Sequence, residues 1–284
     1  MRYVSEPEWR ARMEAYEQRV DALIAPHLAR QHSGRKHPVH DFLFTYYNNR
    51  PAHLRRWHPG PGVVLAGEPP HSGWRGYVQT PDGTVVDPDF VERRRNLVEG
   101  TRRLLSATAS RPAFTGCFGL HEWAMVYRTA AGGVRHEDWP LRLGHQGTDE
   151  VVEAHQIRCS HFDAFRFFTD DARPRNSLQP TSGTRETHEQ PGCLHANMDL
   201  YKVCFRLAPL IPSELTLEAF ELAGEIRELD MRASPYDLAG LGYQPIRIET
   251  REGKAEYAAA QRAFADRSAA LRGRILEAFA PLPL

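Results

Sequence analysis

The sequence predicts an α+β protein that is predominantly α-helical, with a small N-terminal antiparallel sheet and a helical core that carries a polar site. Three observations support this prediction. Long stretches repeat apolar residues every three to four positions, short β-branched runs lie between residues 63 and 88, and 284 residues with 41% hydrophobic content can bury a sizeable core. Because no internal repeat or linker divides the chain, we expect residues 1–284 to form a single domain.

The first expected helix begins after Ser5, because Ser5-Glu6-Pro7-Glu8 has the spacing of a capping box. Apolar residues follow at steps of four and three, which places them on one helical face. They are Trp9, Met13, Tyr16, Val20 and Leu23. The next segment, residues 37–61, is rich in arginine, proline and aromatic residues, and we expect short irregular elements there.

The small sheet is expected within residues 63–88. The runs "VVLAG" and "YVQTPDGTVVDP" are rich in β-branched residues, and Pro81-Asp82-Gly83 has the composition of a tight turn. Further along the chain, after a break at Gly132-Gly133, "DWPLRL" and "EVVEAHQIRC" alternate well enough to predict additional strands.

The rest of the chain is expected to be helical, apart from one long polar segment. Apolar spacing predicts helices over about 90–105, 118–127, 194–207, 213–229 and 256–279. Residues 170–192 are polar and rich in proline, serine and threonine, which predicts a long surface loop or mobile lid.

The charge balance limits the classes of partner. The formal net charge is zero, so an anionic partner would have to be held by a local patch. Only three of the 36 basic residues are lysine, which leaves 33 arginines. The first 30 residues have no apolar signal-peptide core, and no run of 18 uncharged apolar residues occurs. We therefore expect a cytoplasmic protein with no membrane partner and four reduced cysteines.

Three remote segments share one layout, in which a cysteine is followed within four residues by a histidine and then by a carboxylate. Buried imidazoles and carboxylates need partners, because an unpaired buried charge is costly. We therefore expect the three segments to line one site, together with residues 230–237. The segments hold Cys117, His121 and Glu122; Cys159, His161 and Asp163; and Cys193, His195 and Asp199.

Each motif also has a purely structural interpretation. Ser160 and Asp163 have the spacing of a helix start, and His121 can be a buried histidine that a neighbour satisfies. His195 and Asp199 lie one helical turn apart, as they would on an ordinary polar stripe.

One functional hypothesis is a metal-dependent enzyme, an oxidase that acts on a small molecule. Imidazole and carboxylate groups on facing helices bind iron or manganese in helical proteins, and open positions there allow oxygen chemistry. The expected ligands are His121, His161, His195 and Asp199. The spacing matches neither His-x-x-x-His nor Cys-x-x-Cys.

The other hypothesis is hydrolysis without any cofactor. A carboxylate kept ionised by a neighbouring histidine or arginine would activate water or stabilise an oxocarbenium ion. The candidate catalytic residues are Glu122, Asp163, Asp199, Asp230, His121 and His195. The residues expected to hold a flat base are Trp123, Tyr127, Phe162, Tyr201, Arg232, Tyr236 and Asp237.

A local feature also suggests contact with nucleic acid. In "NNRPAHLRRWHPG", Arg50, Arg55, Arg56 and Trp57 combine guanidinium groups with an aromatic ring, which suits phosphate contact and base stacking. The alternative is an ordinary solvated or ion-paired surface.

Six stretches of the sequence carry a resemblance to a known family. They are "HPVHDFLFTYY", "LRRWHPGPGV", "GCFGLHEWAMVYR", "RCSHFDAFRFFT", "GCLHANMDLYK" and "LDMRASPYDL". The chain resembles, over most of its length, a bacterial family commonly labelled 3-methyladenine DNA glycosylase. The resemblance implies base-excision repair, in which the N-glycosidic bond of an alkylated purine in damaged DNA is hydrolysed. It places the glycosylase first among our expectations, whereas the residues by themselves favour the metal-dependent enzyme.

Overall fold

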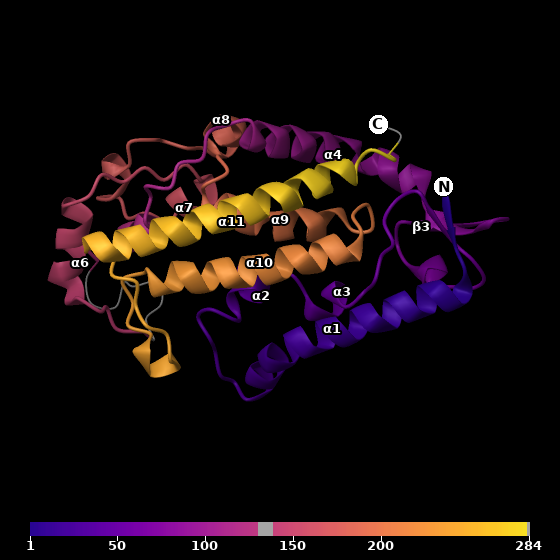
Figure 1. Cartoon of the computed structure of the whole chain (residues 1–284), viewed down its shortest axis with the longest axis horizontal. Helices are drawn as coiled ribbons and strands as arrows, with labels where there is room; N and C mark the ends of the chain where they lie inside the picture. Colours follow the sequence, from indigo (N-terminus) through magenta and orange to yellow (C-terminus); the bar gives the residue numbers. More distant parts are fainter. Residues whose placement is uncertain (130–138, 283–284) are drawn as a thin grey trace. The chain divides into compact units, whose positions relative to one another are not determined.

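A computed structural model describes residues 1–129 and 139–282, and it confirms a predominantly helical α+β protein with one small sheet (Figure 1). The chain divides into two compact units, each of which is assembled from separate stretches of sequence. The first consists of Met1–Leu105, Leu200–Ala223 and Ala270–Leu284, and the second of Ser106–Asp199 and Gly224–Ala269. The expectation of a single domain over residues 1–284 stays a prediction.

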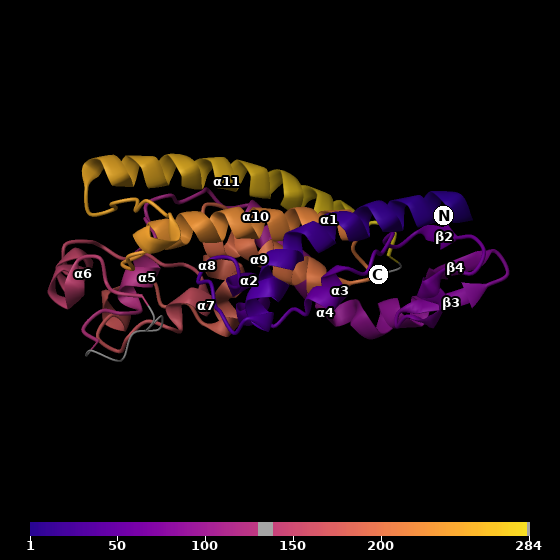
Figure 2. The ribbon, with the colours of Figure 1, turned by 90° about the horizontal axis from the view of Figure 1, so that it is seen from below.

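The first unit contains a four-stranded sheet in the order β1-β2-β4-β3, and Figure 2 shows it near the N-terminus. The prediction of an antiparallel sheet was wrong in one respect, because β1 pairs with β2 in parallel and the sheet is mixed. Three residues of β1 are too few for sequence periodicity to reveal a strand. The strands are β1 (Arg2–Val4), β2 (Val63–Leu65), β3 (Tyr77–Thr80) and β4 (Gly83–Val86).

Helix α1 (Glu6–His32) confirms the predicted first helix, and it buries Trp9, Tyr16 and Val20. Ser5 occupies the N-cap position but makes no side-chain capping hydrogen bond. The irregular segment after α1 contains short helices, as expected. The other helices that begin in this part of the chain are α2 (Phe42–Tyr46), α3 (Pro51–Leu54), the 3-10 turn η1 (Pro70–Gly73) and α4 (Pro88–Ala109).

The second unit differs most from the sequence predictions. The strand predicted over "EVVEAHQIRC" was wrong, because α6 (Gly144–Glu153) covers its first residues. Thr148, Val151 and Val152 are buried at helical spacing, and this pattern overrides the short alternation. In "DWPLRL", Leu141 forms only an isolated bridge with Tyr236. Asp138 and the break at Gly132-Gly133 lie outside the described residues.

Two further predictions in this unit need correction. The helix expected over 118–127 is shorter, and α5 spans Leu120–Ala124. The polar segment 170–192 is not simply a surface loop, because it buries Asn176, Glu189 and Gln190. It contains the 3-10 turns η2 (Arg173–Arg175) and η3 (Ser182–Thr184) and helix α8 (Arg185–His188), and α7 (Phe162–Phe165) precedes it.

The predicted C-terminal helices are confirmed as α9 (Leu194–Leu207), α10 (Ser213–Arg232) and α11 (Arg251–Glu277), with the 3-10 turn η4 (Ala239–Leu241) between the last two. Within each unit, the portions of α10 and α11 lie side by side (Figures 1 and 2). Glu218 pairs with Arg274 in the first unit, and Glu225 pairs with Arg267 in the second. None of the described helices is both long and apolar enough to span a bilayer.

Candidate metal centre

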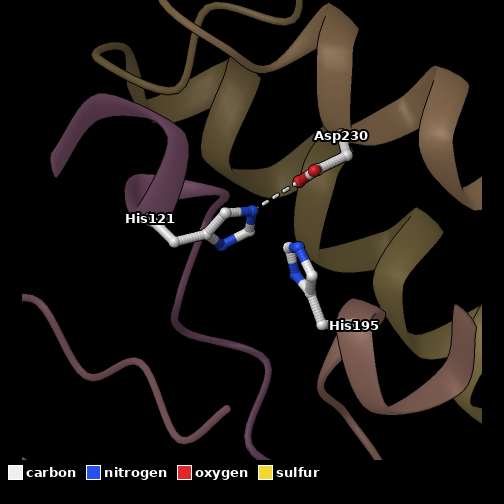
Figure 3. A group of neighbouring side chains, drawn as sticks. All are labelled: His121, His195 and Asp230. Carbon is white, nitrogen blue, oxygen red and sulfur yellow. Dashed lines mark ion pairs between the residues drawn. The ribbon is translucent and has the colours of Figure 1, made fainter. Parts of the chain in front are cut away.

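Three buried side chains from three helices of the second unit converge (Figure 3). His121 comes from α5, His195 from the first turn of α9 and Asp230 from the last turn of α10. Phe118 and Gly119 adopt φ values of 46° and 70° just before α5, so the chain turns sharply into that short helix. We refer to His121, His195 and Asp230 as the triad.

The triad is compact and shielded from water. One donor atom from each residue lies within 4.8 Å of the other two. The exposed fractions are 5% for His121, 7% for His195 and 0% for Asp230. The rings of His121 and His195 meet edge to face, with centroids 4.5 Å apart. Such burial of three donor groups demands either mutual pairing or a bound cation.

The contact between His121 and Asp230 has the spacing of two ligands. His121 Nε2 and Asp230 Oδ1 are 2.9 Å apart, yet they lack the alignment of a hydrogen bond. Two donor atoms bound at right angles to one ion at about 2.1 Å lie about 3.0 Å apart. The pair therefore matches the separation expected across a metal ion as well as that of an ion pair.

A buried arginine adds charge beside the triad. Arg227 Nη1 lies 2.8 Å from Glu122 Oε1 and 3.4 Å from Asp230 Oδ2. Two carboxylates thus face one guanidinium, and either a protonated His121 or a bound cation would supply the second positive charge. The neighbouring carboxylates also change the pKa of His121. Burial by itself lowers the pKa of His121, but the Asp230 and Glu122 carboxylates together outweigh burial and raise it.

His195 is held neutral. Burial lowers its pKa well below the ordinary value, and the charges of His121 and His161 lower it further. A neutral imidazole keeps a lone pair on one ring nitrogen, which is the form that binds metal ions.

A second buried polar group adjoins the triad, and we call it the His161 cluster. His161 Nε2 lies 3.4 Å from Asp199 Oδ2 and 3.6 Å from Glu189 Oε1. Arg185 contacts the same two carboxylates at 3.0 and 2.6 Å. The rings of His161 and His195 are 5.4 Å apart between centroids. Arg185 thus pairs with both carboxylates that face His161, whereas the three donor atoms that lie within 4.8 Å of one another are those of the triad.

A small pocket opens beside the two triad histidines. Its size admits little more than a water molecule or a single ion. Burial raises the pKa of all three cysteine thiols that line it, that of Cys159 to about 12, so these thiols are neutral at physiological pH. The lining residues are Cys117, His121, Ile157, Arg158, Cys159, Ser160, Gln190, Cys193, Leu194 and His195.

Of the three segments predicted to line one site, the structure therefore brings only some residues together. His121 and His195 join the triad, and their cysteines meet Cys159 at the pocket. His161 and Asp199, both expected as metal ligands, belong instead to the His161 cluster. Asp230, expected only as a catalytic carboxylate, provides the third donor atom of the triad.

The other expected site residues lie elsewhere. Asp163 pairs with Arg166 at 3.3 Å. None of the residues expected to hold a base is among those that line the pocket. Trp123 is fully buried and donates its indole N–H to Ala233 O, and Tyr127 bonds Glu153. Five residues remain. Phe162 is partly buried and Tyr236 is buried, whereas Tyr201 belongs to the first unit. Arg232 donates a hydrogen bond to Gln244 O, and Asp237 is exposed.

The residues expected to contact nucleic acid separate into two kinds. Arg55 is exposed but pairs with Glu17 and Asp21, and Trp57 is fully buried with its indole N–H on Glu214, so both are engaged within the protein. Arg50 and Arg56 are exposed.

Three charged residues at the site, Arg227, Arg185 and Glu189, were not anticipated from the sequence. Arg227 precedes Asp230 by three residues, a spacing that places both on one helical face and could have indicated the pair. Arg185 and Glu189 have the same kind of local spacing, four residues apart, but their contact with His161 depends on the tertiary fold.

Comparison of the chain with protein-family models, with curated proteins and with solved structures finds no match.

Proposed function

We propose that the chain is a metal-dependent enzyme in which His121, His195 and Asp230 bind one divalent first-row metal ion. The observation that supports this proposal is the convergence of three donor atoms within 4.8 Å of one another in a fully buried position. A surface histidine stripe or a helix cap would need no such convergence.

The donor set favours iron or manganese. Two imidazoles and one carboxylate on one side of an ion are the ligands of non-haem Fe(II) oxygenases, and they leave other coordination positions open. The pocket beside His121 and His195 is where a water molecule, dioxygen or a substrate atom would reach those positions. We therefore expect oxidation of a small molecule, with Arg227 and Glu122 holding Asp230 in place.

Base excision stays a prediction that depends on the resemblance. A purine is much larger than the pocket, as is any organic substrate of the proposed oxidase, so either activity would require the surrounding chain to move. The carboxylates Glu122 and Asp230 beside Arg227 would be the catalytic candidates in that case.

Elemental analysis of protein purified without chelators tests the proposal. We expect about one equivalent of iron or manganese in the wild type, and loss of this metal in His195→Gln and Asp230→Asn variants. Titration of metal-free protein with Co(II) should give visible absorption bands that both variants lack. His145→Ala, which removes an exposed histidine on α6, is the matched control and should retain the metal.

The expected chemistry can be contradicted directly. Wild-type protein that binds neither iron, manganese nor Co(II) would exclude the proposed centre. Release of methylated purine from alkylated duplex DNA, unchanged by chelator and abolished by Glu122→Gln or Asp230→Asn, would instead support the glycosylase. Circular dichroism of each variant separates metal loss from unfolding.

A further inference from the structure

A cluster of arginines in the first unit surrounds Phe90 near the start of α4. The guanidinium carbons of Arg94, Arg75 and Arg93 lie 5.2, 5.9 and 6.0 Å from the centre of the Phe90 ring. Cation–π attraction of this kind holds guanidinium groups in place without neutralising them. Of the three, Arg93 is paired with Asp87 at 3.1 Å.

The last turn of α9 brings a further arginine to this place. A Cβ atom on Gly76 would lie 3.0 Å from Pro209 and 3.4 Å from Phe90, so these three residues are in close contact. Arg75 precedes this contact in the chain, and Arg206 lies three residues before Pro209. The positive charges of Arg75 and Arg206 act on Arg94, whose pKa is lowered by burial first and by these two charges next.

Asp87 compensates Arg93, but the other arginines of this cluster lack a carboxylate partner in the described part of the chain. Within residues 1–129 and 139–282, no acidic side chain lies at ion-pairing distance from Arg75, Arg94 or Arg206. Several arginines elsewhere in the first unit are paired, for example Arg19 with Glu221 and Arg274 with Glu218. In a chain of zero formal net charge, two unpaired guanidinium groups over the Phe90 ring, with Arg206 nearby, produce a local positive field.

We propose that Arg75, Arg94 and Arg206 form a binding site for phosphate groups. Guanidinium groups recognise phosphate oxygens through paired, charge-assisted hydrogen bonds, and a bound phosphate would supply the negative charge that the protein omits here. The surface continues beyond one phosphate, because Arg56 lies 5.6 Å from the Trp74 ring, next to Arg75. This site is independent of the proposed metal centre.

The phosphate groups can belong to a small phosphorylated molecule or to a nucleic-acid strand, and two probes distinguish these sources. Binding of pyrophosphate is measured by calorimetry, and binding of a fluorescein-labelled single-stranded dT oligonucleotide by anisotropy at low salt. We expect the Arg75→Ala/Arg94→Ala/Arg206→Ala variant to weaken binding at least about tenfold. If the oligonucleotide is the ligand, removal of three phosphate contacts should reduce the slope of log affinity against log salt by about 2.

The matched control is Arg10→Ala/Arg19→Ala/Arg274→Ala, which removes the same charge from paired, exposed positions of the same unit. It should change affinity less than about twofold. The single variant Arg206→Ala, at an exposed position, tests the site where the triple variant is unstable. Binding of pyrophosphate alone supports a small-molecule ligand, and binding of the oligonucleotide supports a phosphodiester strand. The proposal is overturned if wild-type protein binds neither probe, or if the cluster variant and the control bind equally.

Discussion

Arg227 is the residue on which the buried charges of the second unit depend. Its side chain is 1% exposed and contacts Glu122 at 2.8 Å and Asp230 at 3.4 Å. A buried ion pair contributes little net stability when it is compared with an apolar pair, but removal of one partner leaves the other charge buried without compensation. Arg227 therefore positions the proposed ligand Asp230 and offsets the energetic cost of burying the Asp230 charge.

We expect Arg227→Met to lower the free energy of unfolding by about 3–5 kcal/mol, because two carboxylates would remain buried without a guanidinium. Urea unfolding followed by circular dichroism measures this change. Arg267→Ala is the control, since Arg267 pairs with Glu225 at the surface and its loss should cost about 0–1 kcal/mol. Equal effects of the two substitutions would show that the buried network contributes no more than a surface ion pair.

At the scale of elements, the small sheet is held together by strands of three or four residues, so single backbone contacts matter. Gly83 begins β4 with a φ of 134°, a conformation that other residues rarely adopt. A Cβ atom at this position would overlap the carbonyl oxygen of Leu65 in β2. Glycine is therefore required where β4 passes β2.

We expect Gly83→Ala to destabilise the protein by roughly 1–3 kcal/mol, through backbone strain and overlap with β2. Thermal unfolding monitored by circular dichroism measures the change. Gly73→Ala provides the comparison, because a Cβ atom there meets open space and its φ is not positive. If both variants melt at the wild-type temperature, the close approach of β4 and β2 does not constrain residue 83.

The elements of the second unit show how short helices create a site. α5 has only five residues, and α7 has four, yet they carry His121 and begin next to His161. Long helices α9 and α10 provide the partners His195 and Asp230 on rigid scaffolds. The site thus combines side chains from short, turn-defined elements with side chains from long ones.

At the scale of the whole molecule, buried neutral histidines make stability depend on pH. Burial, with the charges of His71 and Arg56 next, lowers the pKa of His58 to about 3, and burial lowers that of His71 to about 4. His58 Nδ1 forms a hydrogen bond with Tyr77 OH, and His71 donates its Nε2–H to Trp57 O at 2.8 Å, so Nε2 of His71 carries the proton. The unfolded chain protonates these histidines near pH 6.5, whereas the folded chain resists protonation.

Stability should therefore be complete above pH 6.5 and fall as the pH drops from 6.5 toward the folded values near 4 and 3. Each histidine adds a slope of up to about 1.4 kcal/mol per pH unit in that window. We expect His71→Gln, which keeps a donor for Trp57 O, to make the dependence shallower by about this amount. Urea unfolding between pH 7 and 5 measures it, with His145→Gln as the exposed control. An unchanged slope in His71→Gln would contradict the assignment.

The sequence predicts those elements whose pattern is long and local. α1, α4, α9, α10 and α11 follow from apolar spacing over many residues, and β2, β3 and β4 follow from β-branched runs around a turn. A strand was wrongly predicted over the end of α6, because the short run around Val151 and Val152 is compatible with a strand as well as with a helix. β1 escaped prediction because its pairing with β2 joins residues about 60 positions apart, which no local pattern records.

By itself the sequence determined which kinds of side chain gather at the candidate site, because buried imidazoles, thiols and carboxylates in apolar segments must find partners. Only the tertiary structure decided which of them meet. Asp230 joins His121 and His195, whereas Asp199 lies beside His161 and pairs with Arg185. Packing between helices far apart in the chain sets these distances, and residue spacing along the chain carries no information about them.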